Sequence, residues 1–482
     1  MTSTNSPGRP GWSLALLAFS SLITSLDFTI VYVALPEIVR EIGFSGHSAQ
    51  WVISAYAVFF GGFLLLGGRS GDLLGRRRMF VLGMVVFGGA SLLGGLATSP
   101  ATLIAARALQ GVGAAVVFPA TLSLVNTMFA EGRERVRALG VWAMAGAGGL
   151  SLGALLGGVL TQAFGWEAVF LVNVPLVIAA APAAFRLLAA DGPVERGHGY
   201  DLPGVLTGTA GATLLVYAIA EVPETGWTSS SFVVAAVLAV VLLAAFLGVE
   251  ARSRSPLMPL RLLRNRHLAP ALLIIFVFGA TMQNVVYFLT LYFQDVLRYS
   301  ALQAGLGFLG LSAVIALGNS VAGRLTIRVG VRSTLIIALV LGAAGSALLA
   351  VGMTADGSYL TVLAGICVYG MGMGTIYPTQ FAAAGTGVAA REQGIAGGMA
   401  NTAMQIGVGV GLAVLVGVAA PDIAAADGLR AAVAVSAGLT LLGVIAALAI
   451  PGRRAGEPAP HAVPQDAATS SAHDIEAPER TG

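Results

Sequence analysis

The sequence predicts an all-helical integral membrane protein with 14 transmembrane helices, and three observations support this prediction. First, 56% of the 482 residues are hydrophobic and only 10% are charged, whereas soluble domains are about a quarter charged. Second, 14 stretches are long and apolar enough to cross a bilayer as helices, which takes about 17–25 residues. Third, the arginines between these stretches fall almost wholly on alternate sides.

Each stretch is predicted to be a helix, because a lone strand in lipid leaves its backbone groups unpaired and barrel strands are short and alternate in polarity. The predicted spans are residues 12–35, 49–68, 79–98, 101–127, 138–162, 167–189, 203–221, 231–250, 267–292, 302–325, 333–353, 358–382, 393–420 and 428–450. Polar segments 190–202 and 251–266 bracket two of these helices, 203–221 and 231–250. We therefore predict two six-helix bundles with a two-helix insert between them.

This organisation divides the chain into five parts. They are an N-terminal tail (1–11), an N-terminal six-helix bundle (12–189), a linker with two extra helices (190–266), a C-terminal six-helix bundle (267–450) and a C-terminal tail (451–482). The C-terminal tail is rich in Pro, Ala, Ser and acidic residues, a composition typical of disorder. The first span is too long for a cleaved signal peptide and carries Asp27, so it is predicted to be retained.

Arginine supplies all 26 basic residues, and its distribution predicts the orientation in the membrane. With the N-terminus in the cytoplasm, 22 arginines fall on the cytoplasmic side and three on the outer side, and Arg107 lies within a span. Cytoplasmic loops carry the excess of positive charge in membrane proteins. We therefore expect a multi-pass protein of the cell membrane with both termini in the cytoplasm.

The composition also argues against several classes of function. The chain has no lysine, so it lacks the Walker A lysine and is not expected to use ATP itself. The single cysteine, Cys367, lies in an apolar stretch, and none of the five histidines makes a ligand pair, so neither a metal nor a cofactor is expected. No nucleophile, histidine and acid lie at one depth, and the net charge of +3 comes from the cytoplasmic arginines. We expect neither an enzyme nor a nucleic-acid-binding protein.

The sequence contains an internal repeat. Segment 68–78 (GRSGDLLGRRR) aligns with 323–332 (GRLTIRVGVR) at an offset of 255 residues, and two further glycine-rich segments align in the same order at similar offsets. The matched positions include Gly75 with Gly330, Gly113 with Gly372, Pro119 with Pro378, Gly153 with Gly407 and Gly157 with Gly411. Secondary transporters are built from such repeats, with the binding site between them.

Several motifs carry a family resemblance over residues 12–450. They are LDFTIVYVALP (26–36), GRSGDLLGRRR (68–78), RALQGVGAA (107–115), GAGGLSLGALLGG (146–158) and NTAMQIGVGVG (401–411). With these motifs the chain resembles the major facilitator superfamily, and within it the 14-helix drug:proton antiporters (EmrB/QacA-like). The resemblance implies export of a lipophilic drug, antibiotic or toxic metabolite in exchange for protons. The sequence departs from the family pattern at Ala154, where the antiporter motif usually has proline, and at Glu167, where an arginine usually accompanies Trp166.

The alternative on the same scaffold is a proton-linked importer or metabolite facilitator, which Ala154 and the single membrane acid leave open. In either case the expected partners are membrane lipid, protons and a lipophilic small molecule. Nucleic acid and ATP are not expected as partners.

Asp27 is the residue expected to carry the coupled proton, because no other acid lies well inside a predicted span. It lies about eight residues, or ~12 Å, from the outer end of the first span. A charge inside the membrane costs about 2.5–3.5 kcal/mol or more, so the chain must neutralise this carboxyl group or use it. The alternative is a permanent carboxylate that hydrogen-bonds to a neighbouring helix.

Arg107 lies at a similar expected depth, about six residues or ~9 Å from the outer end of its span. Opposite charges attract strongly in a low dielectric, so Arg107 is predicted to tune Asp27 and to release its proton when substrate binds. The alternative is a packing role with bonds to backbone carbonyls. Gln110 lies one turn further on and is predicted to join this network or the substrate site.

Three further groups of residues are candidates. By resemblance, Gly68, Asp72, Gly75, Arg76 and Arg77 form a loop that clasps the two halves and gates the conformational change, besides setting topology. Gly149, Gly153 and Gly157 repeat every four residues and, with Gly158, permit close helix packing, which serves either rocking halves or plain core packing. The substrate candidates besides Gln110 are Tyr56, Trp142, Asn284, Tyr287, Tyr377, Asn401 and Gln405, drawn from a wider set that includes Phe59, Gln283, Tyr292, Asn319, Tyr369 and Gln380.

Overall fold

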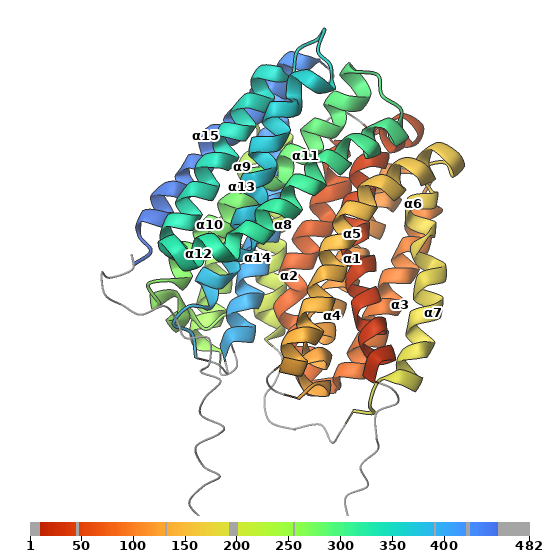
Figure 1. Cartoon of the computed structure of the whole chain (residues 1–482), viewed down its shortest axis with the longest axis vertical. Helices are drawn as coiled ribbons and strands as arrows, with labels where there is room; N and C mark the ends of the chain where they lie inside the picture. The colour runs from red at the N-terminus through yellow and green to blue at the C-terminus, as the bar shows by residue number, and fades with distance from the viewer. Residues whose placement is uncertain are drawn as a thin grey trace, which may run out of the picture.

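The computed structural model describes residues 10–44, 48–130, 133–191, 201–253, 256–389, 392–420 and 425–451, and within these ranges it contains helices and no strands. Figure 1 shows them as one tall bundle of roughly aligned helices. The α-helices are α1 (Pro10–Ile42), α2 (Trp51–Leu74), α3 (Arg76–Gly95), α4 (Pro100–Met128), α5 (Arg133–Phe164), α6 (Ala168–Leu171), α7 (Asn173–Leu187), α8 (Leu202–Thr225), α9 (Ser230–Arg252), α10 (Leu268–Ala280), α11 (Met282–Leu291), α12 (Ala301–Gly352), α13 (Tyr359–Gly385), α14 (Gln393–Ala419) and α15 (Ala426–Leu448).

The predicted 14 passes are all present as helices. Twelve helical segments of the described chain are long and apolar enough to cross a membrane. One of them, α12, has 52 residues and contains two passes that meet at Gly330, and the 32-residue helix α5 supplies the remaining pass. The predicted fold class is therefore confirmed.

Several helices extend beyond the predicted spans, because hydropathy marks only the apolar part of a helix. Helix α1 continues to Ile42 rather than residue 35. Helices α2 and α3 fill most of segment 68–78, which was predicted to be a loop, and only Gly75 separates them. Arginine is a good helix former, so a helix can continue into water through arginine-rich sequence. Gly75 has φ +102°, a conformation that favours glycine.

The two halves repeat one another in their contacts as well as in their sequence. Gly330, the partner of Gly75 in the repeat, also has a positive φ, of 85°, and also joins two consecutive helices. Gly153 of α5 lies so close to α1 that an added Cβ would be 2.6 Å from the Leu26 carbonyl oxygen. Its partner Gly407 of α14 stands in the same relation to α10, 2.4 Å from the Phe276 carbonyl oxygen.

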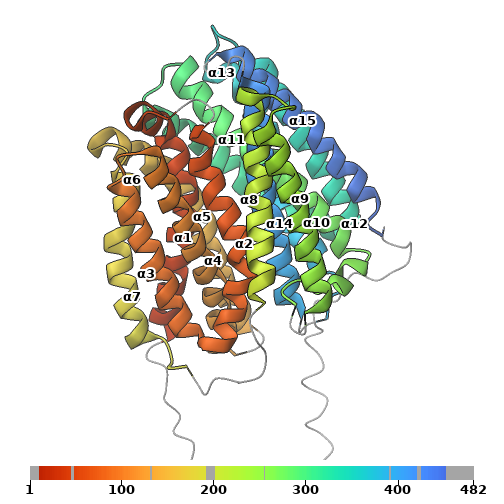
Figure 2. The ribbon, with the colours of Figure 1, turned by 180° about the vertical axis from the view of Figure 1, so that it is seen from behind.

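The inserted helices α8 and α9 lie beside the seam between the two bundles. Figure 2 shows α8 between α2 of the first bundle and α14 of the second. A small apolar cluster holds α8 there, and it includes Val58 of α2, Val216 of α8 and Ala413 of α14. The insert is therefore packed against both halves rather than against one.

The two ends of the bundle are called here the Pro10 face, where α1 begins, and the Ile42 face, where α1 ends. Toward the Ile42 face, α5 and α12 pack through glycine: a Cβ added to Gly158 would lie 2.5 Å from the Ala301 carbonyl oxygen. Gln294, in a π-helical turn (Tyr292–Val296), donates to the Val33 carbonyl oxygen across the seam at 2.8 Å. These contacts close the seam between the bundles on the Ile42 side.

Candidate functional site

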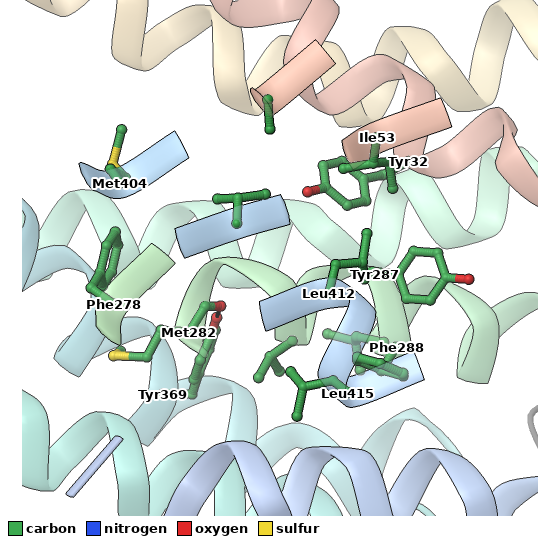
Figure 3. Packing of buried hydrophobic residues seen from close by; sticks show 14 of the residues in the cluster. Tyr32, Ile53, Phe278, Met282, Tyr287, Phe288, Tyr369, Met404, Leu412 and Leu415 are labelled. Atoms are coloured by element: carbon green, nitrogen blue, oxygen red, sulfur yellow. Dashed lines mark hydrogen bonds between the residues drawn. The ribbon is translucent and has the colours of Figure 1, made fainter. Parts of the chain in front are cut away.

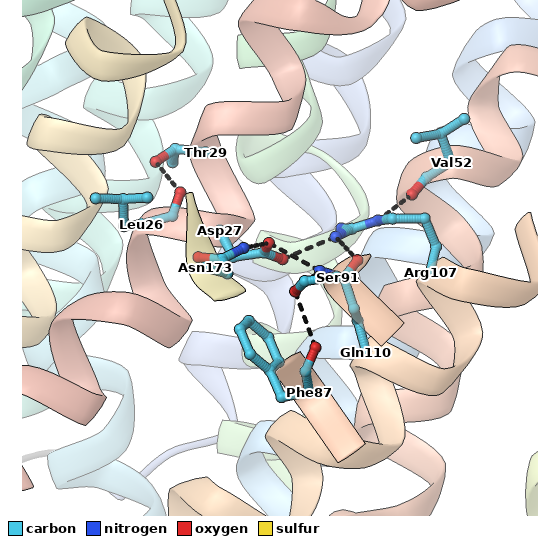
Figure 4. A network of polar contacts seen from close by, with 9 residues as sticks. All are labelled: Leu26, Asp27, Thr29, Val52, Phe87, Ser91, Arg107, Gln110 and Asn173. Atoms are coloured by element: carbon cyan, nitrogen blue, oxygen red, sulfur yellow. Dashed lines mark hydrogen bonds and ion pairs between the residues drawn. The ribbon is translucent and has the colours of Figure 1, made fainter. Parts of the chain in front are cut away.

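Asp27 lies in α1, is 0% exposed, and has both carboxylate oxygens hydrogen-bonded (Figure 4). Its Oδ2 accepts from Nη1 of Arg107 at 2.7 Å. Its Oδ1 accepts from Nε2 of Gln110 at 3.1 Å and from Nδ2 of Asn173 at 2.8 Å. Helices α1, α4 and α7 therefore meet at one carboxylate. The sequence predicted a shared depth for Asp27 and Arg107, and the structure places them in contact.

Arg107 is 1% exposed, and its guanidinium group is held on several sides. Nη1 donates to Asp27 and, at 2.9 Å, to Oε1 of Gln110, while Nε donates to the Val52 carbonyl oxygen at 2.8 Å. The guanidinium carbon lies 4.4 Å from the ring centroid of Tyr56. A buried ion pair offsets its desolvation only when such further hydrogen bonds are present, because each ion costs several kcal/mol to bury.

The estimated depths need correction, although the contact was anticipated. Because α1 extends to Ile42, Asp27 lies 15 residues before the end of the helix rather than about eight before the end of a span. Arg107 lies seven residues after the start of α4 at Pro100. The unequal counts arise because α1 projects further at the Ile42 face than α4 does, so a residue count from a helix end does not measure depth in lipid.

Two members of the network were missed in the sequence. Asn173, at the start of α7, is the third donor to Asp27, and it could have been found as a polar residue in an otherwise apolar span. Ser91 of α3 accepts from Nε2 of Gln110 at 2.8 Å and donates to the Phe87 carbonyl oxygen. Serine is common in the spans, so no local signal distinguished Ser91.

A cavity of about 360 Å³ lies between the two bundles, near the lower limit of the range typical of small-molecule sites. The first bundle lines it with side chains of α1, α2, α4 and α5, and the second with side chains of α11, α12, α13 and α14. Trp142 and Asn319 line it from α5 and α12, on the Pro10 side of the glycine contact that closes the seam. The cavity is therefore covered toward the Ile42 face.

Tyr56 connects the cavity to the buried charges. One face of its ring packs on the Arg107 guanidinium, and the same side chain lines the cavity. Phe28 lies beside it, with ring centroids 6.2 Å apart, and also lines the cavity. Asp27 and Arg107 do not line the cavity themselves. The ring of Tyr56 is therefore in direct contact with both the ion pair and the space that a ligand would occupy.

The predicted substrate residues divide into two groups. Tyr56, Trp142, Tyr377, Asn401 and Gln405 line the cavity. Gln110, Asn284 and Tyr287 do not, and of the wider set only Gln283 and Asn319 do. Cavity residues that were missed include Phe28, Tyr32, Phe60, Phe118, Phe308 and Met373. An aromatic residue in an apolar span looks the same in sequence whether it faces lipid, core or cavity.

Asn284 and Tyr287 instead contact the protein's own backbone and core. The helix breaks at Thr281 between α10 and α11, and Nδ2 of Asn284 donates to the carbonyl oxygens of Ala280 and Val408, at 3.1 Å each. The bond to Ala280 satisfies a carbonyl group that the break exposes, and the bond to Val408 links the break to α14. Tyr287 lies beside Phe288 in a large apolar core shared by the two bundles (Figure 3), which also holds Tyr369 and, from the first bundle, Tyr32.

The predicted gating segment is anchored to its own bundle among the residues described. Nη1 of Arg77 donates to the Leu188 carbonyl oxygen at 3.3 Å, and its guanidinium lies over the ring of Phe185 at 5.5 Å. A Cβ added to Gly68 would lie 3.7 Å from Pro119 of α4, an ordinary contact distance, and Arg76 is also partnered. The side chain of Asp72 lies outside the described residues. The clasp between halves therefore stays a prediction.

Asp191, which follows α7, is the residue that fixes this turn, and the sequence did not reveal it. Its two carboxylate oxygens accept from the backbone N–H groups of Arg77 and Arg78, at 2.9 and 3.0 Å. The carboxylate thus caps the N-terminus of α3, where unpaired N–H groups and the helix dipole favour an anion. A Cβ on Gly75 would lie 2.4 Å from this carboxyl group, so glycine is also required for space.

We predict that Asp191→Ala lowers the free energy of unfolding by about 1 kcal/mol, the usual effect of losing a helix cap. Asp191→Asn is the matched control, because it keeps one acceptor oxygen and should lose about half as much. Thermal unfolding of the purified protein in detergent measures both. Equal stability of the wild type and Asp191→Ala would show that the cap contributes nothing.

The glycine row of α5 packs within its own bundle. Cβ atoms added to Gly149 and Gly153 would lie 2.4 and 2.6 Å from carbonyl oxygens of α1, and one on Gly157 would lie 2.7 Å from the Ile30 carbonyl oxygen. Gly158 alone of the four faces the other bundle. Gly158 therefore lies where the two halves meet, and its role in rocking stays a prediction, whereas the other three glycines serve packing of α5 on α1.

The inserted helices also carry two buried acids. Glu250, near the end of α9, is 3% exposed and accepts from the backbone N–H of Met258 at 2.9 Å. Asp201, also buried, caps the start of α8 through Gly204 N–H at 3.0 Å. Both acids lie at the Pro10 ends of the insert, far along the chain from Asp27.

Two repeated helical bundles around a central cavity, with an ion pair buried beside it, define a polytopic membrane transport protein. A model of the Major Facilitator Superfamily matches residues 17–412 and 313–477. The chain belongs to the Major Facilitator Superfamily.

Curated relatives are similar over most of their length. The chain is 41% identical to the puromycin resistance protein pur8 of Streptomyces alboniger, over 84% of this chain and 81% of the relative. It is also 41% identical to the cephamycin export protein CmcT of Amycolatopsis lactamdurans, over 84% of each. Among solved structures, the nucleoside transporter NupG matches with a TM-score of 0.67 at 13% identity, over 92% of this chain and all of NupG, and supports the fold alone.

Proposed function

We propose that this protein is a proton-coupled exporter of lipophilic small molecules in the cell membrane, with both termini in the cytoplasm. The observation that carries the proposal is the buried Asp27–Arg107 pair, which touches the central cavity through Tyr56. The names of the relatives, which describe resistance to puromycin and export of cephamycin, support an antibiotic-like substrate. The proposed partners are lipid, protons and the substrate, without ATP, nucleic acid or an enzymatic step.

The geometry suggests how a proton and a substrate compete. In the observed state the Asp27 carboxylate is neutralised by Arg107 and two amide donors. Protonation of Asp27 removes its charge, so Arg107 loses its counterion. The guanidinium group is then stabilised mainly by Gln110 and the Tyr56 ring. A substrate that pushes on Tyr56 favours the opposite change, because it restores the close ion pair and expels the proton. Each ligand thereby favours a different conformation.

The sidedness follows from the arginines. The Pro10 face carries the excess of arginine, which places it in the cytoplasm by the positive-inside rule. The seam is closed toward the Ile42 face, so the structure then corresponds to a state that loads from the inside. One proton at a driving force of about 150 mV supplies ~3.5 kcal/mol. That energy sustains a substrate gradient of about 300-fold.

Inverted membrane vesicles test the proposal. Addition of puromycin, as the first of a panel of lipophilic antibiotics, is expected to release protons from the acidified lumen of vesicles that contain the protein. Vesicles without the protein are the control. Proton movement in the same direction as the drug would indicate an importer, and an absence of any proton movement across the whole panel would overturn the proposal.

A further inference from the structure

Two hydrogen-bond donors on the cavity wall have no partner among the described residues. They are the hydroxyl group of Tyr32 on α1 and the indole N–H of Trp142 on α5. Both atoms are buried, and Tyr32 as a whole is 2% exposed. An unpaired buried donor costs about 1–3 kcal/mol, and a bound acceptor would remove that cost. These two groups therefore point to a ligand that brings acceptor atoms.

The wall around these donors is aromatic. Phe118 packs against Trp142 with ring centroids 5.4 Å apart, and Phe60 packs against Phe118 at 6.2 Å. Phe28 packs edge-on against Tyr32 at 5.8 Å. All of these residues belong to the first bundle and line the cavity. Rings on this wall can stack on a flat, apolar ligand, and aromatic pairs add about 0.5–1.5 kcal/mol to simple burial.

The opposite wall is mostly apolar, with Phe308 and Met373 among its residues, and it also holds four amides, one of them Asn319 of α12. Gln283 of α11 and Asn401 and Gln405 of α14 come from the second bundle. Amides offer both donors and acceptors without a formal charge. Among the described residues no charged side chain lines the cavity, and Asp27 and Arg107 are bonded to each other behind Tyr56. A ligand in this cavity thus meets an aromatic face on one side and an apolar face with a few neutral amides on the other.

Resting on the proposed export function, we propose that the substrates are uncharged amphiphiles that combine a ring system with carbonyl or similar acceptor oxygens. The ring system packs on the Trp142 wall, and acceptor oxygens at different points of the ligand take the free donors of Trp142 and Tyr32, which lie at different depths along α5 and α1. A permanent cation in the same place would lose its hydration and gain no buried counterion, which is costly in a low dielectric.

This assignment fixes the charge moved in each cycle. One proton exchanged for an uncharged molecule carries one net positive charge across the membrane. Transport of such a substrate therefore responds to membrane potential as well as to the pH gradient. Exchange of one proton for a monovalent cation moves no net charge and responds to the pH gradient alone.

Proteoliposomes containing the full chain test this directly, with a potassium diffusion potential imposed by valinomycin. The neutral probes are chloramphenicol and Nile Red, and the permanent cations are ethidium and tetraphenylphosphonium. We expect transport of the neutral probes, accelerated by a potential in the driving direction, and little transport of the cations. Equal or better transport of the cations, or transport of the neutral probes without any response to potential, overturns the assignment. Transport of neither class, together with no antibiotic-induced proton release, overturns the proposed function and this inference with it.

Two conservative variants test the free donors. Trp142→Phe and Tyr32→Phe keep a ring and remove one donor, so each is expected to raise KM for chloramphenicol about three- to tenfold, the loss of one hydrogen bond, with kcat little changed. The matched controls are Tyr217→Phe on α8 and Trp227→Phe in the turn between α8 and α9, which lie outside the cavity and should leave KM unchanged. An unchanged KM in both cavity variants would show that these donors do not contact the substrate.

Discussion

Replacing Asp27 with Asn abolishes proton-driven export. Asparagine has nearly the same shape but cannot exchange a proton, so the event that would alternate the charge on this helix is lost. Antibiotic-induced proton release in inverted vesicles should fall to the level of vesicles without the protein. Full proton-driven transport by Asp27→Asn would end the proposal that this carboxyl group carries the proton.

The same substitution leaves Arg107 buried without its counterion, so stability has to be measured beside transport. Removing one partner of a buried ion pair costs about 3–5 kcal/mol, whereas removing both is often close to neutral. The double variant Asp27→Asn/Arg107→Gln is the control, and it should recover most of the stability but none of the transport. Thermal unfolding in detergent reports the first quantity and proton release the second. Recovery of both would mean that the pair serves packing alone.

Most of the fold could be predicted from the sequence, because lipid imposes a simple rule on it. A helix must be apolar for about 17–25 residues, and the arginines between helices reveal their direction, so 14 passes and an inserted pair emerged without a structure. The internal repeat predicted from the sequence is also present in the backbone, since Gly75 and Gly330 have a positive φ at equivalent turns. Helix ends were less predictable, because α1 and α2 continue beyond their apolar parts through residues that hydropathy assigns to loops.

The candidate site was predictable where it involved charge and unpredictable where it involved shape. Asp27 and Arg107 stand out because charges are rare in membrane helices, and the structure does pair them. Asn284 was predicted to contact substrate because polar residues are also rare in membrane helices, but its amide hydrogen-bonds to a carbonyl group left unpaired where the helix breaks at Thr281. The aromatic wall around Trp142 left no trace in the sequence, since the choice between lipid, core and cavity depends on how the two bundles meet.

Replacing Gly158 with Ala is the second change from which we expect a large effect, and it acts on the conformational equilibrium rather than on the chemistry. The new Cβ would lie 2.5 Å from the Ala301 carbonyl oxygen and 2.9 Å from the Leu302 Cα, so α5 and α12 must separate toward the Ile42 face. Overpacking of this kind costs about 1–3 kcal/mol. A cost of that size shifts the equilibrium away from the closed Ile42 face about 5- to 150-fold.

Accessibility of the cavity measures that shift. In a Cys367→Ser background, a cysteine introduced at the cavity residue Ser312 should react faster with an impermeant maleimide added from the Ile42 side when Gly158 is Ala. Gly148→Ala is the matched control on the same helix, because an added Cβ there meets nothing within 4 Å. Both substitutions raise helix propensity equally, so a difference between their labelling rates comes from the contact between α5 and α12. Gly153→Ala, which faces α1 of its own bundle, should instead lower the unfolding temperature without exposing the cavity. If Gly158→Ala leaves the labelling rate at the Gly148→Ala value, the glycine contact between α5 and α12 does not control closure.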